Sequence, residues 1–269
     1  MDAPTRDDPD APEPAPSSTA SAAVAPGPAT TRELLPYAIL TGLCGLLPVP
    51  IVDDFAASLA RGAMLRRVAH RHDLRLDRFA QRLLVRASYP IGGAPGQIAL
   101  SALRVAFRKV FLVVNVGLRA DDALATFVLG HLFDRYCREL HRRDLDGEWV
   151  TESRAGQIRA AVDGSLRGAG SAVLREVFAR ALGSGWEWLR SVPGAVMTFV
   201  GSVIRRDEKG GEESVEELLR EEKGFFGRVA DLTAEGIGAV GDDYFRSVEN
   251  AFDESMGNRQ RASSGGGAA

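Results

Sequence analysis

The sequence predicts an all-α protein: a multi-helix bundle that contains an apolar helical hairpin and has a disordered segment at each end. Apolar residues recur at intervals of three and four through most of the chain, and the apolar–polar alternation of a strand is almost absent. Both ends consist of small and polar residues, with too little apolar surface to form a core. A chain of 269 residues, 45% of them hydrophobic, is otherwise long enough to bury one.

Two segments that are predicted to be disordered flank the folded part of the chain. Residues 1–30 contain Ala, Pro, Ser and Thr with an excess of acids, and we expect a disordered tail. This segment lacks the basic start and apolar core of a signal peptide, so the sequence favours a cytoplasmic location. Residues 258–269 form a second disordered tail by the same criterion. The run Asp144–Gly147 suggests a boundary between a helical domain at 31–145 and a second helical region at 146–257.

Residues 34–52 form a stretch of nineteen residues without a charge. Thr30 and Glu33 precede it with the spacing of a capping box, which predicts a helix that begins near Thr30 and ends at Pro48. The stretch is long enough to span a bilayer, but prolines at 36, 48 and 50 interrupt it. Two interpretations stay open: a helix buried in the protein and followed by a corner, or a membrane-embedded or re-entrant hairpin.

The next helix is predicted to begin at Asp53 and Asp54. Apolar residues at 52, 55, 56, 59 and 63 follow one face of it. Carboxylates at a helix start are favoured by the helix dipole and by the free N–H groups, so we interpret this acid pair as a cap rather than as metal ligands. His70 and His72 follow, and no further ligand cluster joins them, so we expect no metal site.

A stripe of arginines marks the following helix. Arg75, Arg78, Arg82 and Arg86 lie on one flank of a predicted amphipathic helix, beside its apolar face. Residues 53–86 contain eight arginines and four aspartates, a formal charge of +4. A basic flank beside an apolar face is typical of a helix that lies on anionic lipid, and also of a helix that packs on a core with a solvated side. We therefore expect these four arginines to contact lipid or a partner.

Two more helices are predicted in the middle of the chain, at about 97–114 and 120–141, after a loop at 89–96 that is rich in Gly and Pro. His131 falls on the second of them at helical spacing with other packed residues. Because the sequence shows no partner for it, we interpret His131 as a packed helix residue rather than a base.

Two motifs in this part of the chain carry a resemblance. The segment LPVPIVDDFAASLARGAMLRRVAHRHDL has a Pro-x-Pro-x-x-Asp helix start and a later Met, and Thr126, Leu129, Gly130 and Tyr136 form a Thr-x-x-Leu-Gly-x5-Tyr pattern. Both resemble a bacterial domain of unknown function that occurs behind some GTPases and in YcjF-type inner-membrane proteins, and the EcsC family has a similar pattern. The resemblance covers about 34–141 and implies an all-helical, membrane-associated module with no assigned catalysis. The segment RKVFLVVNVGLRADD departs from the Pro/Gly-rich apolar hairpin of that pattern.

Small residues recur at every fourth position beyond residue 150. Gly156, Gly164 and Gly168, together with Ala160 and Ala172, leave a narrow groove along one side of a helix. Glycine lowers the stability of an isolated helix by about 1 kcal/mol, so a packing partner must compensate. We expect close helix–helix contact here, within the chain or between copies.

Trp186 and Trp188 introduce an uncharged segment at 191–204, which Arg205 and Arg206 follow. Aromatic residues at one end and arginines at the other resemble a segment anchored at a membrane interface, so we expect the tryptophans to contact lipid or a partner. Fourteen residues reach about 21 Å at about 1.5 Å each, less than the hydrocarbon core of about 30 Å. A re-entrant segment, a surface helix and a buried helix stay open as interpretations.

The last part of the folded chain consists of a highly charged segment followed by an amphipathic one. Residues 207–223 carry glutamates in pairs at helical intervals and are interpreted as a solvated helix or linker. Residues 225–256 are predicted to form an amphipathic helix with a kink or break near Gly236, Gly238 and Gly241.

The net charge, the cysteine spacing and the absence of known catalytic motifs exclude several classes of function. A formal charge of −3 does not favour nucleic acid as a partner, and Cys44 and Cys137 form no metal spacing or disulfide framework. The chain has no Gly-x4-Gly-Lys-Ser/Thr loop, no His-Glu-x-x-His, no Gly-x-Ser-x-Gly, and no Gly-x-Gly-x-x-Gly after a predicted strand. We therefore expect no cofactor and no catalytic residue.

Three functions stay open, in this order of preference. The first is a non-enzymatic, membrane-associated helical scaffold or regulator on the cytoplasmic side of the inner membrane. The second is a soluble helical protein-interaction module that binds a protein partner or a second copy through the glycine-spaced helix. The third is an enzyme that uses Asp53, Asp54, Asp121 and Asp122.

Overall fold

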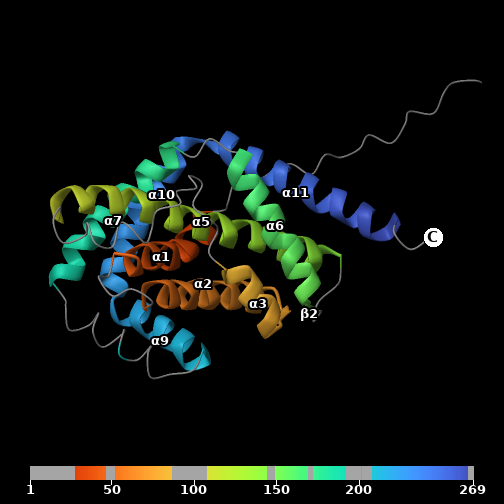
Figure 1. Ribbon diagram of the computed structural model, residues 1–269, viewed down its shortest axis with the longest axis horizontal. Coiled ribbons are helices and arrows are strands. Elements are labelled where there is room, and N and C mark those ends of the chain that lie inside the picture. Colours follow the sequence, from red (N-terminus) through yellow and green to blue (C-terminus); the bar gives the residue numbers. More distant parts are fainter. Residues whose placement is uncertain are drawn as a thin grey trace, which may run out of the picture.

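A computed structural model of the protein describes residues 28–46, 52–86, 108–143, 149–168, 172–191, 201 and 208–265. Almost all of these residues are helical, and the predicted all-α bundle is confirmed (Figure 1). The helices are α1 (Pro28–Cys44), α2 (Val52–Arg71), α3 (Arg78–Val85), α5 (Arg108–Arg142), α6 (Glu152–Gly168), α7 (Ala172–Ser191), α9 (Glu208–Glu221), α10 (Lys223–Val240) and α11 (Asp242–Gly265). The strands are β1 (Arg75–Leu76) and β2 (Trp149–Val150).

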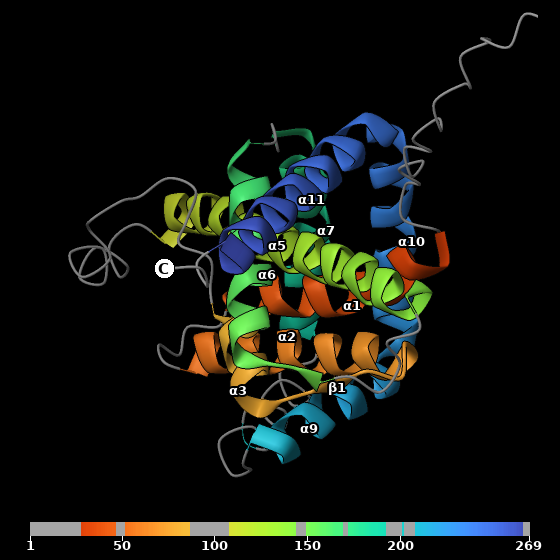
Figure 2. The ribbon, with the colours of Figure 1, turned by 90° about the vertical axis from the view of Figure 1, so that its right-hand side faces the viewer.

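The helix α1, which holds most of the uncharged run, is the centre of the bundle. It lies between α5 and α2, and it also contacts α10 and α7 (Figures 1 and 2). Leu34, Leu35, Ile39 and Leu43 are almost fully inaccessible to solvent. Protein therefore covers most side chains from Leu34 to Leu46, and the interpretation of this segment as buried is confirmed. The helix ends at Cys44, four residues before the predicted end at Pro48, and Pro48 with the corner after it lies outside the described residues.

The start of α1 differs from the predicted capping box. The helix begins at Pro28, two residues before Thr30. The carboxylate of Glu33 does not fold back to the helix start, because it accepts a hydrogen bond of 2.6 Å from Arg67 Nε and forms an ion pair with Arg71. These contacts fix α1 against α2. The second helix begins at Val52, which confirms the predicted helix start at the acid pair.

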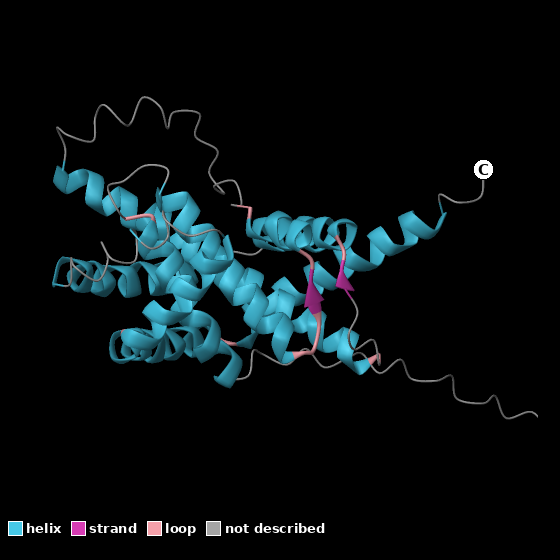
Figure 3. Cartoon of the chain, turned by 90° about the horizontal axis from the view of Figure 1, so that it is seen from below, coloured by secondary structure: helices cyan, strands magenta, loops and turns pink. Residues whose placement is uncertain are grey.

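The arginine stripe does not lie on one helix, which corrects the prediction. Arg75 belongs to β1, which pairs in parallel with β2 (Figure 3). In this pairing Arg75 lies opposite Trp149. The helix α3 begins only at Arg78, where the Asp77 side chain accepts hydrogen bonds from the N–H groups of Phe79 and Ala80. Arg75 is therefore in a strand paired with a remote segment, and the helix begins only after the Asp77 cap.

The middle of the chain forms one long helix rather than two. The expected break near residues 115–119 falls inside α5, which runs without interruption over 35 residues. An ion pair of 3.1 Å between Arg119 and Asp122 and a hydrogen bond from Thr126 Oγ1 to the carbonyl of Asp122 lie within this stretch. Residues 97–107 of the first expected helix lie outside the described residues.

Helices from both predicted regions pack on one hydrophobic core. From the second region, α7 and α10 contact α1, α9 contacts α2, and α6 contacts α3. The segment interpreted as a solvated helix or linker is α9, whose Val215 is fully buried and whose Glu212 is only 5% exposed. The predicted break is confirmed at Gly241, which has a φ of +85° and separates α10 from α11. No helix in the described part of the chain combines the length and apolar character needed to cross a bilayer.

Close helix approach depends on glycines other than those predicted. A Cβ added to Gly42 would lie 2.7 Å from Leu182 Cδ2, where α1 crosses α7. A Cβ on Gly156 or Gly164 would meet no atom within 4 Å, so these glycines do not admit another helix within the described chain. Instead, α6 packs through residues such as Ile158 and Val162. The surroundings of Gly168 lie outside the described residues.

Candidate functional site

The arginines between Val52 and Arg86 divide into a set on α2 whose side chains bond to other helices, and a second, exposed set beyond α2. Within the α2 set, Arg61 is 7% exposed and donates to Thr126 Oγ1 at 3.0 Å and to the carbonyl of Val85 at 3.3 Å. Its burial lowers its pKa, and the charges of Asp122 and Asp54 oppose this effect. Arg61 therefore joins α2, α5 and the end of α3 in the interior.

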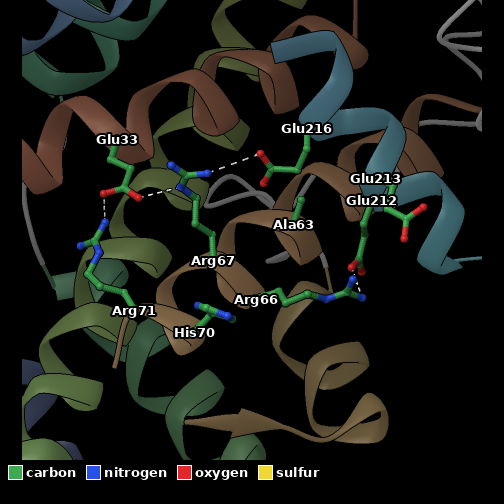
Figure 4. A pocket seen from close by; sticks show the side chains of 9 residues that line it. All are labelled: Glu33, Ala63, Arg66, Arg67, His70, Arg71, Glu212, Glu213 and Glu216. Carbon is green, nitrogen blue, oxygen red and sulfur yellow. Dashed lines mark hydrogen bonds and ion pairs between the residues drawn. The ribbon is translucent and has the colours of Figure 1, made fainter. Parts of the chain in front are cut away.

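Three other α2 arginines meet glutamates across a groove between α1, α2 and α9 (Figure 4). Arg66 forms an ion pair with Glu212, and Arg67 lies 3.6 Å from Glu216 Oε2 as well as bonding to Glu33. The groove has a volume of about 420 Å³, and its walls include three arginines and four glutamates. Because the charges are compensated, the groove acts as a set of interhelical ion pairs rather than as a site for a charged ligand.

Apart from Arg75 of β1, the second set lies on the outer surface of α3 or directly after it. At about 100° per residue, Arg78, Phe79, Arg82 and Arg86 fall within an arc of about 100° around the helix axis. Ala80 and Leu84, on the opposite side of the helix, are buried. The helix and its C-cap residue Arg86 thus present three arginines and one aromatic ring to solvent, and Phe79 is 61% exposed.

Two arginines from other helices hold α3 in this orientation. Arg159 of α6 donates to the carbonyl of Leu84 at 2.9 Å, and Arg61 of α2 donates to the carbonyl of Val85. Positive groups at the C-terminal end of a helix donate hydrogen bonds to its free carbonyls and interact favourably with the negative end of its dipole. The Asp77 cap secures the other end. The exposed side of α3 is therefore a fixed surface.

The strand pair extends this surface with a second aromatic residue. The guanidinium carbon of Arg75 lies 5.8 Å from the centre of the Trp149 ring, and Trp149 is 56% exposed. The guanidinium carbon of Arg82 lies 5.9 Å from the centre of the Phe79 ring. A single residue, Asp77, separates β1 from α3, so the elements that carry Arg75 and Phe79 are adjacent (Figure 2). We call this set the arginine–aromatic face: Arg75, Arg78, Phe79, Arg82, Arg86 and Trp149.

The charge of this face is less compensated than that of α2. Within the described part of the chain, no carboxylate forms an ion pair with Arg75, Arg78 or Arg86. The nearest acid in the sequence, Asp77, uses one carboxylate oxygen to accept the N–H of Phe79 at 3.0 Å. The face therefore combines positive charge with exposed apolar rings.

The remaining predicted site residues do not converge. Asp121 accepts a hydrogen bond of 2.6 Å from Arg175, whereas Asp122 pairs with Arg119 and Asp54 is exposed on α2. Among the described residues, no group of three or more His, Cys, Asp or Glu side chains is placed to hold a metal ion. His70 lines the groove of Figure 4, while His72 bonds to Asp134, so the two histidines do not act together.

Trp186 and Trp188 lie in the last turns of α7, and their side chains fall outside the described residues. Trp149 was not predicted as a site residue, because its pairing with Arg75 joins segments far apart in the chain. The only local signal was its position just after the Asp144–Gly147 boundary.

Comparison with known proteins gives no match: no protein-family profile fits the sequence, and no curated protein or solved structure matches it.

Proposed function

We propose that the protein is a non-enzymatic helical scaffold or regulator that binds peripherally to an anionic membrane surface, through the arginine–aromatic face, on the cytoplasmic side of the inner membrane. The observation that carries this proposal is the presence of two exposed aromatic rings, Phe79 and Trp149, and four exposed arginines on the adjacent elements β1, β2 and α3 or directly after α3. This is also the expectation drawn from the resemblance over 34–141.

The two kinds of side chain contribute different parts of the binding free energy. Aromatic rings prefer the headgroup region of a bilayer, where their apolar body leaves water and their edge stays near polar groups. Each arginine near an anionic surface adds about 1 kcal/mol of electrostatic attraction, which salt screens. The face can therefore hold the protein at the lipid surface without inserting a helix.

The burial of α1 supports a peripheral rather than an embedded mode. The apolar side chains from Leu34 to Leu46 are already covered by α2, α5, α7 and α10. Moving them into lipid would expose the partner helices and remove the centre of the core. The membrane contact is accordingly assigned to the surface of α3, β1 and β2.

The test is flotation of the purified full chain with phosphatidylserine-containing vesicles. The R78Q/R82Q/R86Q variant should bind about a hundredfold more weakly, since three charges at about 1 kcal/mol each are removed. The R167Q/R180Q/R246Q variant, with the same change of charge on exposed residues of α6, α7 and α11, serves as the matched control and should bind like the wild type. An affinity of the wild type that resists high salt and is unaffected in the first variant would rule the proposal out.

A soluble module that self-associates through α6 is the second candidate. One observation favours it: the side of α6 that carries Gly156 and Gly164 is not used for contact within the described chain. A second helix is able to approach such a side closely. Light scattering after size-exclusion chromatography tests this candidate, and a monomer at high concentration would reject it.

A further inference from the structure

A second group of arginines surrounds a cavity that the membrane proposal does not use. The cavity has a volume of about 310 Å³ and lies between the C-terminal part of α5, the start of α6 and α11. Five arginines and two acids, Glu139 and Asp253, are among its lining residues. We call it the arginine pocket, after Arg135, Arg138, Arg142, Arg143 and Arg154.

The arginine pocket differs in charge from two other cavities of the described chain. The groove in Figure 4 is lined by three arginines and four glutamates. A cavity beside the N-terminal part of α1 is lined by Arg32 and by three acids, Asp231, Glu235 and Asp242. Of these three cavities, the arginine pocket alone has an excess of positive side chains.

Buried acids fix two of the guanidinium groups. Arg138 Nη2 lies 2.8 Å from Oδ2 of Asp134, whose side chain is 2% exposed. Arg135 Nη1 lies 3.0 Å from Oε2 of Glu249, whose side chain is 1% exposed. Guanidiniums that are already oriented lose little conformational freedom when an anion binds.

The other arginines stand nearer the solvent. Arg142 and Arg143 share one carboxylate, that of Glu139, at 3.6 and 2.9 Å, and their side chains are 63% and 58% exposed. Arg154, in the first turn of α6, donates to the hydroxyl of Tyr136 at 2.8 Å and lies over its ring. The single carboxylate of Glu139 neutralises only one of the two guanidinium groups of Arg142 and Arg143, so the solvent-facing edge of the pocket keeps a positive charge that an anion can neutralise.

We propose that the arginine pocket binds a phosphate monoester, either a small soluble ester or the headgroup of a lipid. A guanidinium donates two parallel hydrogen bonds to phosphate oxygens, and a dianion with three terminal oxygens is able to meet several guanidiniums at once. The volume is at the lower end of the range for ligand pockets, which selects a compact ligand. This site uses none of the residues of the arginine–aromatic face and does not depend on the proposed function.

Two probes separate the two sources of the ligand. Glycerol 3-phosphate, titrated into the full chain by calorimetry, represents the soluble ester. Vesicles of phosphatidylcholine with phosphatidic acid, compared with vesicles in which phosphatidylserine supplies the same charge, represent the lipid headgroup. The R142Q/R143Q variant removes two exposed pocket arginines, and R167Q/R180Q removes two exposed arginines outside the pocket as the matched control.

We expect R142Q/R143Q to weaken the binding of at least one probe by about tenfold or more, while R167Q/R180Q leaves it unchanged. Binding of glycerol 3-phosphate identifies a soluble ligand. A preference for phosphatidic acid over phosphatidylserine that R142Q/R143Q abolishes, without binding of the soluble ester, identifies a headgroup. The proposal is overturned if the wild type binds neither probe, or if the two double variants lose binding equally.

Discussion

The guanidinium of Arg75 lies against the ring of Trp149, and the two residues face each other across the parallel strand pair β1–β2. This contact joins the segment before α3 to the segment before α6. It places an exposed aromatic ring beside the arginines of α3, although Trp149 is remote from them in the sequence. The pair is therefore the structural link through which two separate segments make one surface.

Substitution of Trp149 tests the contribution of this ring to membrane binding. W149A should weaken the binding of phosphatidylserine vesicles by about tenfold, because a large ring no longer enters the headgroup region. The free energy of unfolding should change by less than about 1 kcal/mol, since the ring is 56% exposed. Vesicle flotation and urea unfolding measure the two quantities.

W149F is the matched control, because it keeps an aromatic ring at the same position. It should retain most of the vesicle affinity. Equal affinities of W149A and the wild type would show that Trp149 has no part in the contact with lipid.

Local pattern was enough to predict the central helix and several helix ends. The uncharged run predicted a helix through Leu43, and the acid pair after Val52 predicted the start of α2. Glycines near 236–241 predicted the break at Gly241. Each of these features is encoded by neighbouring residues, through capping, dipole and backbone freedom.

Features that depend on remote contacts were not predictable from such patterns. Arg61 and Arg78 are the same residue type on predicted helices, yet one is buried against Thr126 and the other is exposed. Glu212 resembles its exposed neighbours but is buried against Arg66. Periodicity shows which side of a helix is apolar, and it does not show which helix will cover a charged residue.

Asp134 makes the stability of the bundle dependent on pH. Its carboxylate lies 2.9 Å from His72 Nε2 and is also contacted by Arg71 and Arg138. Burial raises the pKa of Asp134, but the hydrogen bond from His72 and the charges of Arg138, His72 and Arg71 outweigh it, so the pKa is lowered. A lowered pKa in the folded state stabilises the protein above the pKa of the unfolded chain, and this stabilisation is lost as pH falls through the folded pKa.

D134N should therefore lower the free energy of unfolding by about 2–3 kcal/mol at neutral pH. The difference between variant and wild type should shrink as the pH falls below about 4, the usual pKa of an unfolded Asp. Urea unfolding at a series of pH values measures this. E176Q removes an exposed partner of Arg180 with the same i,i+4 spacing and should cost less than about 0.5 kcal/mol. A difference between D134N and wild type that stays constant down to low pH would contradict the assignment.

Glu249 connects α11 to α5 through two buried contacts. It lies 2.9 Å from His131 Nε2 and 3.0 Å from Arg135 Nη1, and both His131 and Glu249 are inaccessible to solvent. His131 was interpreted as a packed residue without a partner, and the structure supplies one from the end of the chain. The His131–Glu249 pair is thus a buried polar contact between α5 and α11 inside an apolar core.

E249Q should destabilise the protein by about 1–3 kcal/mol, because the buried contacts to His131 and Arg135 lose their negative charge while Arg135 keeps its second ion pair, with Asp253. E254Q removes a charge from an exposed position of the same helix and should have almost no effect. Hydrogen exchange should show faster opening of α11 in E249Q than in E254Q. Equal stabilities of the two variants would mean that the buried contact contributes nothing to the docking of α11.

Gly42 and Gly164 should respond in opposite directions to alanine. At Gly42 a methyl group would lie 2.7 Å from Leu182 Cδ2 and 3.1 Å from Ala123 Cβ, so G42A should destabilise the protein by about 1–3 kcal/mol. At Gly164 a methyl group meets open space, so G164A should stabilise α6 by about 0.5–1 kcal/mol through its higher helix propensity. Thermal unfolding of both variants measures these changes. If G164A instead lowers the stability at high protein concentration and the wild type self-associates, the open side of α6 is a contact between copies, because a methyl group would then hinder the second helix.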